Sequence, residues 1–133
     1  MNIHYWSSPS GNTEALANKL STPTYRIPGD TADYTVLAVP TYEQPRLGDY
    51  IPRPVRQWLK DNHQYVIGVI GCGNLNFGSD YCRAAVEIAE KLNVPVLYRC
   101  ELRGTETDVT NIDAGIAEHW RTLVEMRQGL TVQ

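Results

Sequence analysis

Apolar and polar positions follow two alternating periods along this chain. The run Tyr65–Ile70 is almost entirely apolar, as a buried strand is, and residues 80–92 repeat apolar side chains every three or four positions, as a helix does. The full pattern predicts strands at residues 2–6, 24–27, 34–39, 65–70 and 94–98, and helices at residues 13–20, 53–61, 80–92 and 106–126. Such alternation is typical of a parallel sheet with helices on both faces.

One connection is too short for a helix. Only Pro28–Asp33 separate the second predicted strand from the third. In a sheet of order 2-1-3-4-5 this link must pass over the first strand, roughly 10 Å sideways and about 13 Å back. About six extended residues reach roughly 20 Å, so a taut crossover without a helix can span it. We therefore predict a single α/β domain over residues 1–133, a three-layer sandwich with five parallel strands in that order.

The loop after the first strand, Ser7–Thr13, suits an anion. Its hydroxyls precede a predicted helix, whose first-turn amides and dipole also favour negative charge. The loop holds no Lys or Arg and lacks the spacing of a P-loop or of a dinucleotide-binding fingerprint. An ordinary capped turn between strand and helix is the alternative interpretation.

Two further loops leave the same predicted edge of the sheet. Gly71–Gly78 contains three glycines, two asparagines and no charge, so its backbone can approach a flat, neutral group closely. Pro40–Glu43 adds an aromatic ring, Tyr42. In a doubly wound sheet, ligands bind where such loops meet, beyond the carboxyl ends of the strands. A phosphate joined to a flat heteroaromatic ring would fill all three loops, which predicts FMN.

The predicted cofactor-binding residues lie in these loops and at the start of the helix that follows the third of them. They are Ser7, Ser8, Ser10, Gly11, Asn12, Thr13, Pro40, Thr41, Tyr42, Glu43, Gly71, Cys72, Gly73, Asn74, Asn76, Phe77, Gly78, Tyr81 and Cys82. Some of these positions have a second interpretation. Phe77 forms the edge of the ring site or plugs the loop into the core, Asn74 and Asn76 bind the ring or simply turn the chain, and Cys72 is favoured as a small filler over a redox thiol.

Four segments of the chain resemble the NrdI family, the flavodoxin-like activators of class Ib ribonucleotide reductase. They are Ser7–Thr13, Pro40–Tyr42, Gly68–Gly78 with the motif G-N-x-N-F-G, and Val94–Thr105 with the motif E-L-x-G-T. The resemblance implies a flavodoxin-like fold, bound FMN, a reductant protein, and the small radical-bearing subunit of the reductase as partner. It also implies that reduced flavin meets dioxygen, and that the resulting oxidant drives formation of a tyrosyl radical at the partner's dimanganese site. The protein would then be an accessory redox flavoprotein whose chemistry takes place on FMN, with no catalytic side chain of its own.

The loop after the third strand departs from the pattern of the family. The family has P-T-Y-G-G-G, whereas Glu43, Gln44 and Pro45 follow Tyr42 here. In the family those glycines lie beside the flavin N5, where positive φ is needed when the peptide flips on reduction. Because a residue with a Cβ is disfavoured at positive φ, we predict that Glu43 opposes the flip and destabilises one-electron-reduced flavin.

Composition and the spacing of the cysteines exclude several other classes of protein. A net charge of −3 and a pI near 5.5 argue against a general nucleic-acid or anionic membrane surface. Three cysteines without C-x-x-C spacing predict neither a disulfide framework nor a zinc site, and a cytoplasmic protein is expected. No cysteine is followed by an arginine five residues on, which excludes a low-molecular-weight phosphatase, and Pro40 stands where a receiver domain needs an aspartate.

A general electron-transfer flavodoxin remains the alternative function. Such proteins are commonly more acidic around the flavin than the neutral loops of this chain. The apolar Leu75 and Phe77, in a loop otherwise made of glycine and asparagine, predict a partner surface at Leu75–Ser79 and Tyr42–Asp49.

Overall fold

The computed structural model describes residues 1–41, 50–75, 78 and 81–132. Its centre is a five-stranded parallel sheet with the order β2-β1-β3-β4-β5, as predicted from the sequence. The strands are β1 (Ile3–Tyr5), β2 (Thr24–Arg26), β3 (Thr35–Pro40), β4 (Val66–Gly73) and β5 (Val96–Glu101).

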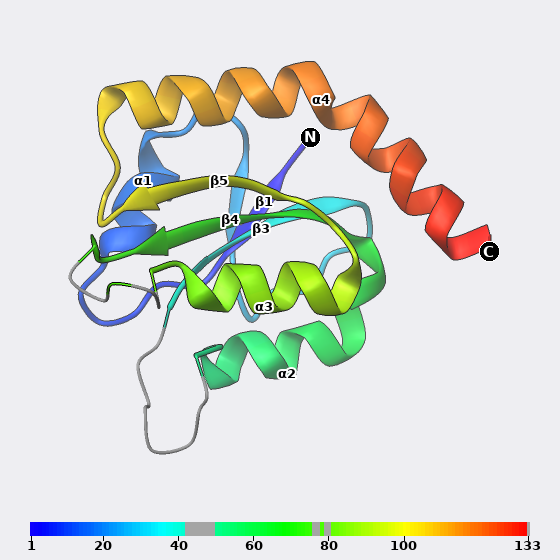
Figure 1. The fold of residues 1–133 in the computed structure, drawn as a ribbon, viewed down its shortest axis with the longest axis horizontal. Coiled ribbons are helices and arrows are strands. Elements are labelled where there is room, and N and C mark those ends of the chain that lie inside the picture. Colours follow the sequence, from blue (N-terminus) through cyan, green and yellow to red (C-terminus); the bar gives the residue numbers. More distant parts are fainter. Residues whose placement is uncertain (42–49, 76–77, 79–80, 133) are drawn as a thin grey trace.

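Helices cover both faces of this sheet (Figure 1). They are α1 (Asn12–Lys19), α2 (Arg53–Asn62), α3 (Arg83–Leu92) and α4 (Glu106–Val132), with a short 3₁₀ helix, η2 (His63–Tyr65), after α2. Successive side chains of β3 lie on opposite faces of the sheet. Val36 packs with α1 and α4, while Leu37 packs with α2 and α3. This is the period-2 division expected of a strand buried on both sides. Among the described residues, no helix is long and apolar enough to cross a membrane.

The link between β2 and β3 contains no helix, as predicted from its length. Side chains of α2 hold it instead. The Trp58 indole N–H donates to the carbonyl of Gly29 at 2.8 Å, and the Asn62 amide both accepts from the Thr31 N–H at 3.1 Å and donates to Asp30 at 3.0 Å. The irregular backbone of the link is thus satisfied from a helix on the neighbouring layer.

Some predicted element boundaries are wrong. β4 continues to Gly73, three residues into the expected glycine loop, because Gly71 to Gly73 pair with Arg99 to Glu101 of β5. β5 accordingly lies at 96–101 rather than 94–98, and α3 begins at Arg83 rather than at residue 80. Pairing with strands on both sides extends a central strand beyond its apolar run, which periodicity alone does not reveal.

Candidate ligand-binding site

A pocket of about 260 Å³ opens at the carboxyl edge of the sheet. It lies where the loops after β1, β3, β4 and β5 meet, because parallel strands all end at the same edge. The lining residues are Ser8, Ser10, Asn12, Thr13, Pro40, Thr41, Cys72, Gly73, Asn74 and Leu102. The three loops singled out from the sequence therefore come together around one cavity, and all of these residues except Leu102 are among those predicted.

The loop between β1 and α1 presents hydroxyls and amides to this pocket. Gly11 precedes the helix with φ +73°, and among the described residues no heavy atom beyond those of Gly11 and its two chain neighbours lies within 4 Å of where its Cβ would be, so its role is conformational. Ser7 is buried and its Oγ accepts a hydrogen bond from the Glu14 N–H at 3.1 Å, which caps the first turn. The N–H groups of Asn12 and Thr13 have no partner within the helix, as first-turn amides never do.

The side-chain oxygens of the same loop cluster at the pocket. The hydroxyls of Ser8 and Ser10 lie 2.7 Å apart, and Thr13, which is almost completely buried, lines the same pocket. The arrangement of several hydroxyls with the amides of a helix start is a donor set for an oxyanion such as a phosphate.

Thr41 joins the end of β3 to the start of α3. Its N–H donates to the Cys72 carbonyl at 3.3 Å, and its Oγ1 accepts from the Ala84 N–H at 3.2 Å. Pro40 and Thr41 line the pocket from this side. Thr41 therefore fixes the wall of the pocket as well as lining it.

The glycines of β4 pack against α3. A Cβ on Gly71 would lie 2.9 Å from the Cβ of Cys82 and 3.0 Å from that of Ala85, and a Cβ on Gly73 would lie 2.9 Å from the Tyr81 ring. Gly73 also lines the pocket, whereas Gly71, Tyr81 and Cys82 are not among the described residues that line it. Gly78 has φ +59° and is exposed. Four predicted residues, Tyr42, Glu43, Asn76 and Phe77, lie outside the described residues.

The buried thiols of Cys72 and Cys82 are poorly suited to redox or nucleophilic roles. The Sγ atoms of Cys72 and Cys100 are 4.0 Å apart, and this contact together with burial raises the pKa of Cys72 well above its ordinary value. Burial also raises the pKa of Cys82 to about 11. Both thiols are protonated near neutral pH, so Cys72 offers the pocket a small, neutral surface.

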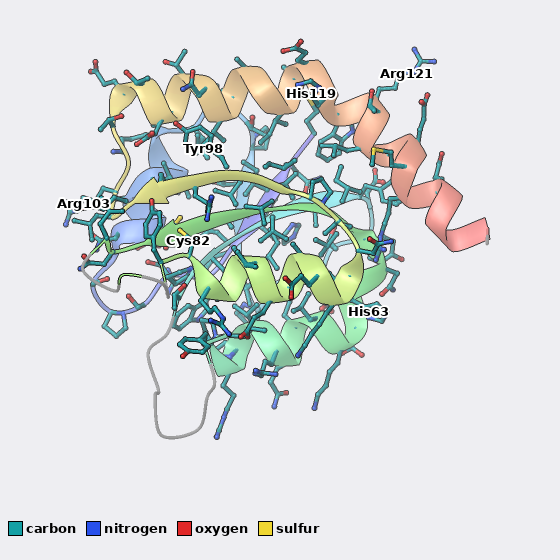
Figure 2. All side chains as sticks on the ribbon, in the orientation of Figure 1. His63, Cys82, Tyr98, Arg103, His119 and Arg121 are labelled. Atoms are coloured by element: carbon teal, nitrogen blue, oxygen red, sulfur yellow. The ribbon has the colours of Figure 1, made fainter. Side chains whose placement is uncertain are left out.

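Leu102 lines the pocket and Arg103 follows it in the chain, and neither is among the residues predicted from the sequence. Leu102 has φ +53° and is 41% exposed, while the Arg103 Nε–H donates to the Asn12 Oδ1 at 3.1 Å. Figure 2 shows Arg103 at the same edge, on the loop after β5. The E-L-x-G-T segment that contains these two residues could have pointed to them, because it follows the last predicted strand and so lies at the same edge of the sheet as the other loops.

The chain matches one known family along most of its length. The family model described as NrdI flavodoxin-like matches residues 4–114. Protein NrdI of Mycobacterium leprae is 41% identical over 132 residues, covering 90% of this chain and 96% of that protein. Protein NrdI of Cronobacter sakazakii is 40% identical over 125 residues, covering 88% and 94% respectively.

Solved structures of flavodoxins share the fold. A short-chain flavodoxin associated with a PDU bacterial microcompartment superimposes with a TM-score of 0.63 at 17% identity, covering 92% of this chain and 97% of that one. A flavodoxin of Streptococcus pneumoniae superimposes with a TM-score of 0.56 at 20% identity, covering 91% and 97%. With the family match extending over residues 4–114 and relatives near 40% identity, this chain belongs to the NrdI flavodoxin-like family.

Proposed function

We propose that this protein binds FMN and, once reduced, supplies an oxidant derived from dioxygen to the small subunit of a class Ib ribonucleotide reductase. There the oxidant would assemble the dimanganese–tyrosyl radical cofactor. The observation that carries the proposal is a single pocket that joins an anion-binding helix start to a neutral wall, in a member of the NrdI flavodoxin-like family.

The residues around the pocket suit a phosphate-bearing flavin. Ser8, Ser10 and Thr13, with the amides at the start of α1, would hold the phosphate. Gly73, Asn74 and other uncharged residues of the wall would lie against the flat ring, since a flavin ring is largely neutral and planar. When bound, the flavin supplies electron transfer to dioxygen, and the chain itself binds and orients it. The thiols of Cys72 and Cys82 have raised pKa values and are not expected to take part in this redox chemistry.

Exposed apolar side chains beside the pocket support a protein partner at this edge. Leu75, next to the lining residue Asn74, is 61% exposed, and Leu102 is 41% exposed. Large exposed leucines at the mouth of a polar pocket are suited to burial against another protein. We propose that the reductase small subunit covers this surface, and that a reductant protein approaches the same edge.

Removing two hydroxyls should test the phosphate site. The changes are Ser8→Ala with Thr13→Val, because valine keeps the shape of the buried threonine while removing its oxygen. Loss of charge-assisted donors should weaken FMN binding by about 1–3 kcal/mol in total, measured by quenching of flavin fluorescence. The control pair Ser21→Ala with Thr110→Val removes the same groups from exposed positions and should leave affinity unchanged. Unchanged affinity in the pocket pair would refute this assignment.

A single charge should test the partner surface. Leu75→Asp is expected to spare FMN binding but to weaken association with a class Ib small subunit at least several-fold, because an apolar contact is replaced by a buried carboxylate. Met126→Asp changes an exposed apolar residue of α4, 56% exposed, and should leave association intact. Surface plasmon resonance with the immobilised small subunit measures both. Equal binding by the two variants would exclude Leu75 from the interface.

The rate at which air reoxidises the reduced protein separates the proposed function from electron transfer. A protein that delivers an oxygen-derived oxidant should reoxidise rapidly in air and yield radical when the manganese-loaded small subunit is present. Slow reoxidation, with no radical detected by electron paramagnetic resonance, would favour a general electron-transfer flavodoxin instead.

A further inference from the structure

Arg103 places a positive charge beside a pocket whose described lining has none. The lining residues include no Lys or Arg, yet Arg103 directly follows the lining residue Leu102 and donates from its Nε to another lining residue, Asn12, at 3.1 Å. This bond leaves the terminal guanidinium nitrogens able to donate to an anion. Arg103 therefore brings charge from the loop after β5 to the start of α1, an end of the helix that already favours anions.

The backbone that carries Arg103 is fixed on both sides. The Lys19 Nζ donates to the Gly104 carbonyl at 3.1 Å, and a Cβ on Gly104 would lie 2.9 Å from a methyl of Leu16, so this loop packs directly on α1. On the other side, Thr105 and Asp108 exchange hydrogen bonds of 2.7 and 3.1 Å that cap α4. Arg103 therefore projects from a short segment held between two helices, although its side chain is exposed.

The contact with Arg103 also decides how the Asn12 amide is turned. A guanidinium can only donate, so the atom of Asn12 that faces Arg103 must be the oxygen. The amide nitrogen of Asn12 is then left as the donor for the pocket that this residue lines. Without Arg103, nothing in this contact would distinguish the two ends of the amide, and an acceptor could face the phosphate as readily as a donor.

We propose that Arg103 is a positioning and specificity-determining residue for the phosphate of the flavin. It holds Asn12 with its N–H₂ toward the pocket and adds a positive charge at the phosphate end, which favours FMN over riboflavin. This inference rests on the proposed function, because it assumes that the pocket holds a flavin phosphate. Since Arg103 is exposed, solvent and salt screen its charge, and a moderate effect that depends on salt is expected.

Titration of the apoprotein with FMN and with riboflavin, at low and high salt, tests the proposal. Arg103→Met should weaken FMN binding by about 3- to 10-fold at low salt, leave riboflavin binding unchanged, and reduce the dependence of FMN affinity on salt. Arg103→Lys keeps the charge but loses the planar donor that orients Asn12. Its FMN affinity should therefore fall between those of the natural chain and Arg103→Met. Arg121→Met removes an arginine whose side chain is 93% exposed and pairs with Glu125 in α4, and it serves as the matched control.

Combination with Asn12→Ala separates the two parts of the proposed role. If Arg103 acts partly through Asn12, Arg103→Met should cost less FMN affinity in the Asn12→Ala background than in the natural chain. Equal losses of FMN and riboflavin would indicate a merely structural role and overturn the proposal, as would unchanged FMN affinity. A natural chain that binds riboflavin as tightly as FMN would overturn it while leaving a flavin site in place. A natural chain that binds neither flavin would overturn the proposed function itself.

Discussion

The link between β2 and β3 and the loop between β1 and α1 are both irregular, but their polar groups are satisfied in different ways. In the link, α2 supplies the partners: Trp58 bonds the Gly29 carbonyl and Asn62 bonds the Thr31 amide. In the loop, the hydroxyls of Ser8 and Ser10 bond each other at the pocket wall, and the first-turn amides of α1 have no partner within the helix.

We interpret the link as irregular backbone that serves only the fold, and the loop as irregular backbone that is arranged to bind a ligand. Buried polar groups in native proteins are almost always paired, so a segment whose polar groups already have partners elsewhere in the protein needs no ligand. A segment that directs donors into a cavity gains its remaining partners from whatever binds there. The link should therefore govern stability, and the loop should govern binding.

Asn62→Ala should give the largest effect, and on stability alone. The Asn62 side chain is almost fully buried and also donates to the Trp58 carbonyl at 2.9 Å, so its removal deletes two hydrogen bonds to the link and one within α2. We expect a loss of about 2–4 kcal/mol in the free energy of unfolding, measured with urea, and little change in FMN affinity. Asn18→Ala, at an exposed helix position, is the control. A variant that keeps its stability but loses FMN would reverse the proposed division.

The glycines of β4 test whether the neutral wall is also a packing surface. Gly71→Ala should cost about 1–3 kcal/mol, because its new Cβ would lie 2.9 Å from the Cβ of Cys82. Cys82 precedes α3 with φ +57°, a conformation that glycine adopts without strain, and Figure 2 shows it at that helix start. Cys82→Gly should therefore recover part of the loss when combined with Gly71→Ala, since the contact of 3.0 Å with the Ala85 Cβ remains. A double-mutant cycle in urea measures the coupling, and strictly additive effects would show that the two residues do not compete for space.

The sheet order and the helix-free link could be predicted because they depend on local quantities. Periodicity identifies each element, and the reach of the extended chain limits Pro28–Asp33 to a crossover without a helix. The meeting of the loops at one edge then follows from parallel topology. These arguments need no knowledge of which side chains touch.

The parts that could not be predicted depend on contacts between distant segments. A glycine at position 71 is visible in the sequence, but the missing space for its Cβ is set by Cys82 and Ala85 across the layer. Leu102 lines the pocket and Arg103 bonds the lining residue Asn12, on a loop after β5 that packs on α1 through Gly104 and Lys19. No periodicity or motif spacing encodes that packing.

Gly11→Ala should change stability by no more than about 1 kcal/mol and still impair binding, so it tests directly whether this loop governs binding. Gly11 has φ +73° with open space where a Cβ would be, so the substitution introduces backbone strain of about 1 kcal/mol and no clash. Gly115→Ala, also into open space but within α4, should instead stabilise the protein by about 0.5–1 kcal/mol. Because Gly11 sets the direction of the amides at the start of α1, relief of its strain by a local shift should weaken FMN binding several-fold while urea unfolding changes little. If Gly11→Ala lowers stability without affecting FMN affinity, the left-handed turn serves the fold, and the first-turn amides are not what the phosphate binds.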